Sequence, residues 1–210
     1  RETSIALDTS GNVYIAYHAY GPESLKYATN ASGNWVVKTI DSDDAGYSCS
    51  IALDTSGKAH ISYFDEDVNL KYATDASGNW VTKILDSTSS SNYAGDTSIA
   101  LDTSGNVHIS YRDYDSYDSL GNPDGDLKYV TNASGSWVTT TVASEGSAGA
   151  DNSIAIDKSG NVHICYSYYS SSTSSYGFLV YATNATQSSA TPTPTATPTP
   201  KSTPTLVQTC

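Results

Sequence analysis

The stretch Ser-Ile-Ala-Leu-Asp-Thr-Ser-Gly-Asn-Val-Tyr-Ile-Ala-Tyr, residues 4–17, decides the fold because the chain contains four versions of it. Its first five residues return at 50–54, at 98–102 and, with Ile156 in place of leucine, at 153–157. Each copy continues through a Ser-Gly turn into a second segment at 59–63, 107–111 or 162–166. Apolar and polar residues alternate in both segments, and this period of two predicts β-strands. The turn glycine supplies the positive φ that a tight hairpin needs.

Two further strands are predicted in each repeat. The third begins at Leu25, Leu70, Leu127 and Leu179, and the fourth begins at Trp35, Trp80 and Trp137. Four antiparallel strands in about 45 residues are typical of a propeller blade. We therefore predict an all-β, four-bladed β-propeller over residues 1–187, with repeats starting near residues 3, 49, 97 and 152. The Ser-Ile-Ala-Leu strands should line the axis, the tryptophans should lie on outer strands, and the four blades should close into a ring.

The fourth repeat ends after its third strand, so fifteen strands are expected and the fourth blade should have an uncovered edge. Residues 188–210 form a Thr/Pro-rich tail in which every proline has an even number. In an extended chain, alternate residues face opposite sides, so the threonines can pair with a strand while the prolines face away. We predict that this tail docks as a strand on another copy of the protein, giving a head-to-tail filament. Docking on its own fourth blade and a stiff linker are the alternatives. The residues of the assembly tail are Thr191, Pro192, Thr193, Thr205, Leu206, Val207 and Cys210.

The three cysteines are an odd number, which in a secreted chain indicates an unpaired thiol or an intermolecular bond. We predict that Cys210 forms a disulfide with a neighbouring copy, and that Cys49 is its preferred partner because it lies at a blade end. Cys165 takes the place of Ala16, Ser62 and Ser110 on a packed strand, so it is expected to be buried.

The composition limits the function. Charged residues make up only 15% of the 210-residue chain, and the net charge of −12 disfavours nucleic acid and anionic membranes as partners. No stretch of about 18 apolar residues is present, so no membrane span is predicted. The abundance of Ser, Thr, Tyr, Gly and Asn predicts an extracellular or cell-surface protein. We expect a mature or trimmed product whose targeting segment is gone.

The repeats quoted above, together with Leu-Lys-Tyr-Ala-Thr-Asn-Ala-Ser-Gly-Asn-Trp-Val at residues 25–36, resemble those of secreted bacterial and archaeal β-propeller proteins. The Asp-x-x-Gly-Asn turn is similar to that of the NHL and sialidase-like (BNR) propeller groups. The resemblance covers residues 3–187 and implies the fold, but propellers include enzymes, lectins and scaffolds. The Asp-box spacing of true sialidases is not matched, and their arginine triad has no counterpart because only Arg1 and Arg112 exist.

An acidic loop is the candidate calcium site, since carboxylates are the ligands that calcium prefers. Its residues are Asp113, Asp115, Asp118, Asp124 and Asp126. A solvated acidic loop without a metal is the alternative, and the Asp65, Glu66 and Asp67 segment is a weaker candidate. No other cofactor is predicted.

Three further sets recur at equivalent positions. The aspartates Asp8, Asp54, Asp102 and Asp157 should close the first turn by accepting backbone N–H groups. The histidines His60, His108 and His163 are expected to be half-buried rings between blades rather than metal ligands. The asparagines Asn30, Asn132 and Asn184 are glycosylation candidates in Asn-x-Ser/Thr sequences, and a turn role at these positions is compatible with that modification.

The loops after the second strands differ between repeats and carry tyrosines expected to be exposed, which are suited to binding sugars or proteins. These are Tyr20, Tyr114, Tyr117, Tyr168, Tyr169 and Tyr176. Our leading hypothesis is a non-enzymatic extracellular structural protein that assembles through its tail. A carbohydrate-binding, lectin-like propeller is the first alternative, with glycans as partners, and a secreted lyase or glycosidase is the second. No pair of opposed carboxylates of the kind that glycosidases use stands out in the sequence.

Overall fold

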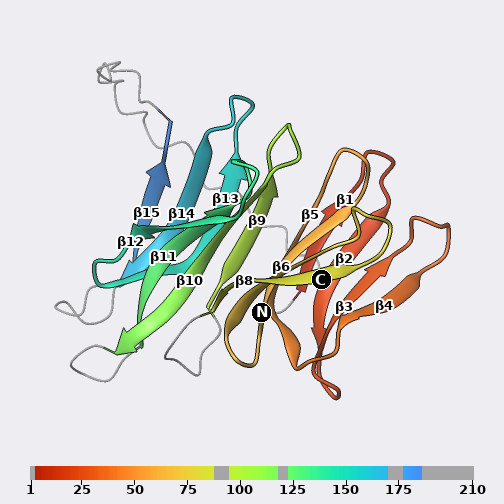
Figure 1. The fold of residues 1–210 in the computed structure, drawn as a ribbon, viewed down its shortest axis with the longest axis horizontal. Coiled ribbons are helices and arrows are strands. Elements are labelled where there is room, and N and C mark those ends of the chain that lie inside the picture. The colour runs from red at the N-terminus through yellow and green to blue at the C-terminus, as the bar shows by residue number, and fades with distance from the viewer. Residues whose placement is uncertain (1–2, 88–94, 118–122, 170–176, 186–210) are drawn as a thin grey trace, which may run out of the picture.

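The computed structural model describes residues 3–87, 95–117, 123–169 and 177–185 of the chain. These residues form fifteen strands in four antiparallel sheets, which we call blades 1–4 (Figure 1). Blade 1 contains β1 (Thr3–Leu7), β2 (Val13–Ala19), β3 (Ser24–Thr29) and β4 (Val36–Asp41). Blade 2 contains β5 (Ala45–Leu53), β6 (Ala59–Asp65), β7 (Asn69–Thr74) and β8 (Val81–Ser87).

Blade 3 contains β9 (Thr97–Leu101), β10 (Val107–Tyr117), β11 (Pro123–Thr131) and β12 (Val138–Ala143). Blade 4 contains β13 (Ser147–Ile156), β14 (Val162–Tyr169) and β15 (Gly177–Thr183). Its three strands pair in the order β13-β14-β15, so the expected uncovered edge is confirmed for the described residues. None of the described segments is a helix long and apolar enough to cross a membrane.

The first hairpin of every blade is closed by its aspartate. Asp8 Oδ1 accepts the backbone N–H groups of Ser10 and Asn12, each over 2.9 Å, and Gly11 adopts a φ of 81°. The same pair of hydrogen bonds is made by Asp54, Asp102 and Asp157. The turn role predicted for these aspartates is confirmed.

The Ser-Ile pair at the start of each repeat joins neighbouring blades. Ser4 Oγ in blade 1 accepts the N–H group of Ile51 in blade 2 over 3.1 Å. The bond recurs from Ile99 N–H to Ser50 Oγ at 3.3 Å and from Ile154 N–H to Ser98 Oγ at 3.2 Å. The first strands of the blades are therefore neighbours in series.

The apolar core is divided into three clusters, each shared by two successive blades. In the first cluster, Leu25 and Tyr27 of blade 1 are buried together with Ile51 and Ile61 of blade 2. Equivalent clusters lie between blades 2 and 3 and between blades 3 and 4. One blade therefore has no core of its own, and each depends on its neighbours for burial.

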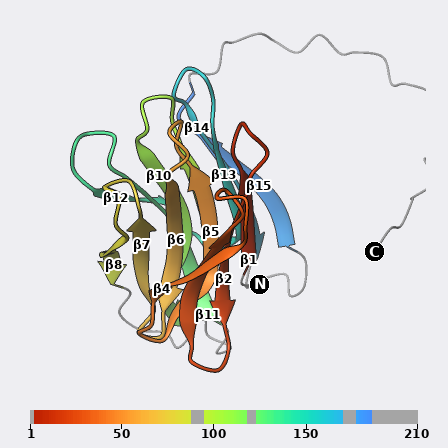
Figure 2. The same ribbon diagram turned by 90° about the vertical axis from the view of Figure 1, so that its right-hand side faces the viewer.

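The four blades form an open arc. Blades 1 and 4 lie at opposite ends of the molecule (Figures 1 and 2). Ile5 of blade 1 is 64% exposed, whereas its equivalents Ile51, Ile99 and Ile154 are 7–8% exposed because a preceding blade covers them. The all-β, four-bladed propeller-like fold is confirmed, but within the described residues the predicted closure into a ring is wrong. The front of blade 1 is left uncovered because blade 4 lies at the other end of the molecule (Figure 1).

Candidate functional site

The interface between blades 1 and 2 is tied by a polar cluster. The Tyr63 hydroxyl donates to Asp41 Oδ2 over 2.7 Å, and Lys71 Nζ lies 2.6 Å from the same oxygen. Burial alone would raise the pKa of Asp41, but the hydrogen bonds from Lys71 and Tyr63 outweigh it and lower the pKa. Burial and the bond to Asp41 raise the pKa of Tyr63. The cluster therefore holds an ionised carboxylate that fills this part of the interface.

The interface between blades 2 and 3 repeats this arrangement. The Tyr111 hydroxyl donates to Asp86 Oδ2, and Lys128 Nζ lies 3.7 Å from that oxygen. Lys128 also forms an ion pair with Asp113 of its own blade. Tyrosine, lysine and aspartate thus recur at equivalent positions in two successive interfaces.

The interface between blades 3 and 4 has lost the two charged members of the cluster. Ala143 pairs with Leu127 in the register in which Asp41 pairs with Leu25, so alanine replaces the aspartate. Val180 pairs with Tyr166 as Lys71 pairs with Tyr63, so valine replaces the lysine. Among the described residues, no hydrogen bond is made to the hydroxyl of Tyr166.

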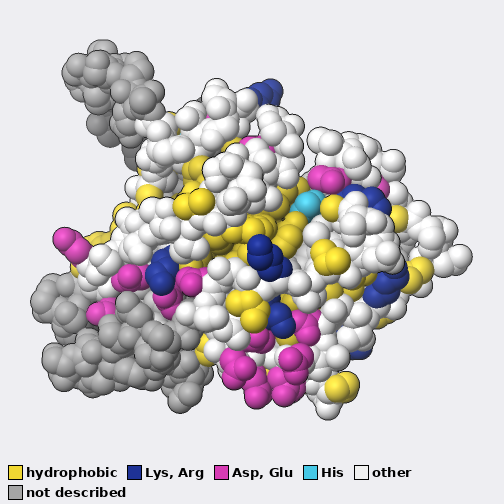
Figure 3. All heavy atoms as spheres, viewed as in Figure 1, with side chains coloured by type: hydrophobic (Ala, Val, Ile, Leu, Met, Phe, Trp, Pro, Cys, Tyr) yellow, Lys and Arg dark blue, Asp and Glu magenta, His cyan; other side chains and the backbone are white. Residues whose placement is uncertain are grey.

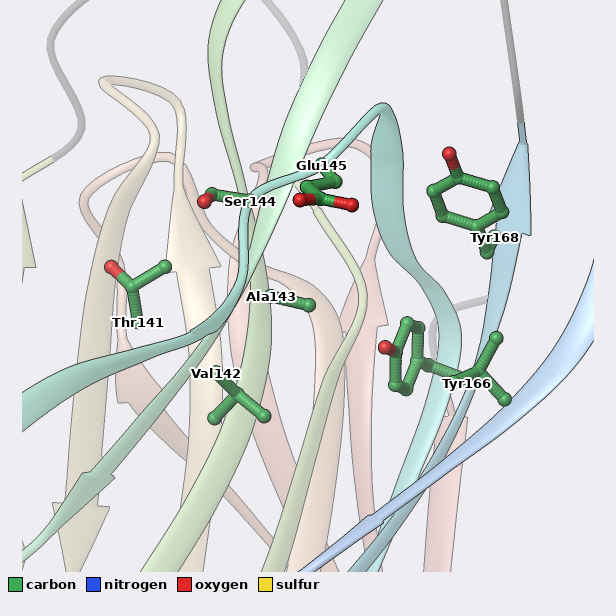
Figure 4. A pocket seen from close by; sticks show the side chains of 8 residues that line it. Thr141, Val142, Ala143, Ser144, Glu145, Tyr166 and Tyr168 are labelled. Atoms are coloured by element: carbon green, nitrogen blue, oxygen red, sulfur yellow. The ribbon is translucent and has the colours of Figure 1, made fainter.

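A hollow of about 630 Å³ opens where the cluster is missing. It is lined by Thr141, Val142, Ala143, Ser144, Glu145, Tyr166, Tyr168 and Val180 (Figure 4). We call it the interblade pocket. Both tyrosines come from β14 and form one wall, while Thr141 and Val142 on β12 and the loop after β12 form the other.

The loop between β12 and β13 passes close to the tyrosine wall because Gly146 has no side chain. Gly146 adopts a φ of 61°, and a Cβ there would lie 2.8 Å from Tyr168 Oη. The loop brings Ser144 and the exposed carboxylate of Glu145 to the pocket. Burial is the main cause that raises the pKa of Tyr166, and the nearby Tyr168 adds to it. The Tyr166 hydroxyl therefore keeps its proton and can act as donor or acceptor.

The pocket therefore combines aromatic rings, aliphatic groups and polar oxygens within a space of ligand size. Tyrosine rings can pack on the apolar face of a small polar molecule. The carboxylate, the hydroxyls of Thr141 and Ser144, and the Tyr166 hydroxyl can bind its hydroxyl groups. Tyr168 belongs to the loop tyrosines identified from the sequence. Tyr166 and the Ala143 and Val180 replacements were missed, although comparison of the repeats contains the signal.

A smaller hollow of about 190 Å³ lies nearby, lined by Tyr129, Val142, Val162, Ile164, Ala182, Thr183 and Asn184. At the other two interfaces a tryptophan packs on the equivalent tyrosine, with centroids 4.9 Å apart for Tyr27 and Trp80 and 5.2 Å apart for Tyr72 and Trp137. Blade 4 has no fourth strand among its described residues. The smaller hollow therefore lies where a tryptophan of that strand would pack.

The acidic loop is mainly part of the β10–β11 hairpin. Asp113 is 3% exposed and pairs across the hairpin with Asp126, while Asp124 Oδ1 accepts the N–H group of Gly125. Asp118 and the side chain of Asp115 lie outside the part of the chain that is described. Within that part, no group of three His, Cys, Asp or Glu residues could hold a metal ion. Calcium binding at this loop stays a prediction.

A second acidic group surrounds Glu66. Repulsion from Asp44 is the main cause that raises the pKa of Glu66, and burial is the second. Asp67 and Asp43 add to the repulsion. Acidic side chains also gather along one edge of the molecule in Figure 3. Asp65 instead binds the backbone N–H and side-chain amide of Asn69 at about 3 Å. This segment serves its own turn and is not a built metal site.

The recurrent histidines are paired within their own blades. His60 Nδ1 lies 2.6 Å from Tyr72 Oη, and His108 Nδ1 lies 2.6 Å from Tyr129 Oη. Both rings are about 5% exposed or less and so are more deeply buried than predicted, whereas His163 in blade 4 is half-buried, as expected. In the first repeat, Tyr14 takes the histidine position and donates to Asp8.

The three asparagines of the Asn-x-Ser/Thr sequences also have a turn role. Asn30, Asn132 and Asn184 each accept, through Oδ1, a backbone N–H group of the second strand over 2.7 Å. Asp75 does the same in the second blade. Their glycosylation stays a prediction.

The cysteines differ from expectation. Cys165 is exposed, so its predicted burial is wrong. Cys49, the predicted disulfide partner, is only 5% exposed. The equivalents of Cys165, such as Ser62 and Ser110, are covered by the next blade, and no described blade follows blade 4. The two described cysteines form no disulfide. Cys210 and the assembly tail lie outside the described residues.

No protein-family model and no curated protein matches the sequence. Several solved structures are similar. AofleA from Arthrobotrys oligospora matches with a TM-score of 0.56 and 11% identity over 86% of this chain and 55% of that chain. An Aleuria aurantia lectin mutant in complex with Fucα1-6GlcNAc matches with a TM-score of 0.53 and 11% identity over 90% of this chain and 64% of that chain.

The intramolecular trans-sialidase from Ruminococcus gnavus matches with a TM-score of 0.53 and 13% identity over 86% of this chain and 42% of that chain. At such identities the likeness is one of fold, and it supports the propeller architecture shared by lectins and sialidase-like domains. The chain spans less than two thirds of each of these three proteins.

Proposed function

We propose that this protein is a non-enzymatic, extracellular carbohydrate-binding propeller, and that the interblade pocket binds the sugar. The observation that carries the proposal is the replacement of the Asp–Lys pair by Ala143 and Val180, which leaves Tyr166 and Tyr168 beside an accessible space. A sugar presents an apolar face to aromatic rings and hydroxyl groups to polar oxygens, and the lining of the pocket offers partners for both.

The charge of the site favours neutral sugars. Glu145 is the one charged side chain in the lining, and the chain as a whole has a net charge of −12. A carboxylate-bearing sugar would be repelled by both. The similarity to a lectin in complex with Fucα1-6GlcNAc is consistent with a neutral ligand and makes fucosylated glycans a sensible part of the test.

Binding without turnover is favoured by the same lining. Hydrolysis of a glycosidic bond commonly uses two carboxyl groups on opposite sides of that bond. The pocket lining contains the single carboxylate of Glu145. The similar structures include both a lectin and an enzyme, so the absence of turnover is part of the proposal.

A glycan array followed by calorimetric titration tests the proposal. We expect Tyr168→Ala to weaken binding of the best neutral glycan by about tenfold or more, as loss of a stacking aromatic ring does. Tyr20→Ala is the matched control, because Tyr20 is 76% exposed and lies outside the pocket lining. Its binding should equal that of the wild type.

A second variant fills the pocket with the protein's own cluster. Ala143→Asp combined with Val180→Lys copies the arrangement of Asp41, Lys71 and Tyr63 and should fold normally. It should abolish glycan binding. Binding equal to the wild type in this double variant, or the absence of any glycan ligand for the wild type, would refute the proposal.

The predicted filament through the tail is a separate matter. Its residues lie outside the described part of the chain, so it stays a prediction. A pocket at the interface between blades 3 and 4 is compatible with a soluble or an assembled form of the protein.

A further inference from the structure

The two ends of the arc expose sheet faces that are buried everywhere else in the molecule. We call the side of a blade toward the preceding blade its front face and the side toward the following blade its rear face. The front face of blade 1 exposes Ile5 and Leu7 at 64%, Trp35 at 57% and Val37 at 58%. Apolar side chains gathered on one exposed face indicate an interaction surface.

The rear face of blade 4 is exposed in the same way. Leu179 is 82% exposed, while its equivalents Leu25, Leu70 and Leu127 are fully buried. Tyr181 is 55% exposed, while Tyr27 and Tyr72 are 5% and 9% exposed. Cys165 pairs with Tyr181 and lies on this face. The residue types are unchanged, so the leucine and the tyrosine are exposed because no blade among the described residues follows blade 4.

The two end faces fit each other by the rules of the internal interfaces. At two of these interfaces a rear-face tyrosine packs on a front-face tryptophan, as Tyr27 does on Trp80 and Tyr72 on Trp137. Tyr181 occupies the same position in blade 4 as Tyr27 and Tyr72 in their blades, and its ring is exposed. Of the three tryptophans in the chain, Trp35 is the one that lies on an exposed front face. Each of them lacks the partner type that the other provides.

The hydrogen-bond series along the first strands also continues from one end to the other. Each internal interface has a serine hydroxyl on a rear face that accepts the N–H group of an isoleucine on the next blade. Ser153 of blade 4 and Ile5 of blade 1 are the next acceptor and donor in this series. Apolar, aromatic and polar contacts are thus all specified by the same two faces.

We propose that a second copy of this chain docks end to end, with the front face of its blade 1 on the rear face of blade 4. The contact repeats an interface that the molecule already forms three times, which is why another copy is the occupant. The two faces are different surfaces, so the contact is heterologous and leaves one face open on each partner. It uses blade faces and does not involve the assembly tail.

Sedimentation velocity at several protein concentrations tests the proposal with the full chain. The wild type should associate as concentration rises. Trp35→Ala should weaken association by about 30-fold, as loss of a central aromatic contact does. Leu179→Asp should weaken it at least as much, because a charge would be buried at the contact. Val81→Ser is the control, since Val81 is 51% exposed on an outer strand of blade 2, and it should associate like the wild type.

Mixing the two defective variants gives the sharper result. Trp35→Ala retains an intact rear face and Leu179→Asp retains an intact front face, so an equimolar mixture should form a dimer that grows no further. Recovery in the mixture would also show that neither variant is misfolded. Maleimide labelling of Cys165 should slow in this dimer only on the chain whose rear face is used. A wild type that is monomeric at every concentration, or a mixture that stays monomeric, would overturn the proposal.

Discussion

Tyr63 on β6 donates its hydroxyl hydrogen to Asp41 on β4 over 2.7 Å and so links blade 2 to blade 1. Lys71 binds the same carboxylate and is only 9% exposed. Its charge is therefore largely removed from water and depends on this partner. Removing one member of such a group is expected to cost more than removing both charged members together.

We predict that Asp41→Ala lowers the free energy of unfolding by about 2–3 kcal/mol. This loss is at the lower end of the range for breaking a buried ion pair, because Asp65 lies 3.8 Å from Lys71 and still faces its charge. The double variant Asp41→Ala/Lys71→Val copies the third interface and should recover most of this loss. Urea denaturation of the three proteins measures both effects. A double variant as unstable as Asp41→Ala would contradict the explanation.

The stability of the fold should also depend on His60. Burial lowers the pKa of His60 below its ordinary value of 6.5, against the opposing effect of Asp54. Below pH 6.5 the unfolded chain then binds a proton that the folded chain does not, so stability present above that pH is lost as the pH falls.

His60→Tyr installs the residue type found at Tyr14 of the first repeat and should reduce this dependence. We expect the urea midpoint to fall less in the variant than in the wild type between about pH 7 and about pH 5.5. Equal falls in both proteins would show that His60 does not carry the effect.

Gly46 is predicted to be the glycine most sensitive to substitution at the first interface. Its φ is 109°, and a Cβ would lie 2.9 Å from the Cα of Leu25 in the neighbouring blade. Gly46→Ala should therefore destabilise the protein by about 3–4 kcal/mol. The new side chain would push the two blades apart, and the backbone of residue 46 would be strained. Gly33 has a φ of 87° with no atom within 4 Å of a Cβ, so Gly33→Ala should cost only about 1–2 kcal/mol.

Deletion of residues 191–210 separates the two modes of assembly. If the blade faces carry association, the truncated protein should sediment like the full chain at every concentration. If the tail donates a strand to a neighbour, as the Thr-Pro alternation suggests, truncation should give monomers with an unchanged melting temperature. The second result would favour the filament predicted from the sequence over the end-to-end contact.

Much of the fold was accessible from the sequence because it is local and repeated. The period of two in 13–17 and its copies specifies strands, and Asp8 and its equivalents specify the turns. Ring closure was not accessible, since it depends on the angle at which blades pack and no single residue determines that angle. The error on Cys165 has the same origin, because the following blade supplies the burial at that position.

The interblade pocket could have been found by comparing the repeats with one another. Ala143 and Val180 depart together from the aspartate and lysine that the first and second blade interfaces would predict. What the sequence could not supply was the knowledge that these positions face each other across an interface. That fact comes from the structure, in which Ala143 on β12 and Val180 on β15 line the same pocket.

Because each apolar cluster is shared by two successive repeats, a gene that gains or loses one repeat changes the number of interfaces by one without requiring a new kind of interface. Duplication of a central unit would bring its own serine, tyrosine and tryptophan contacts in register with both neighbours. The architecture therefore tolerates a change in the number of blades, because each unit finds the same kinds of contact in the units beside it.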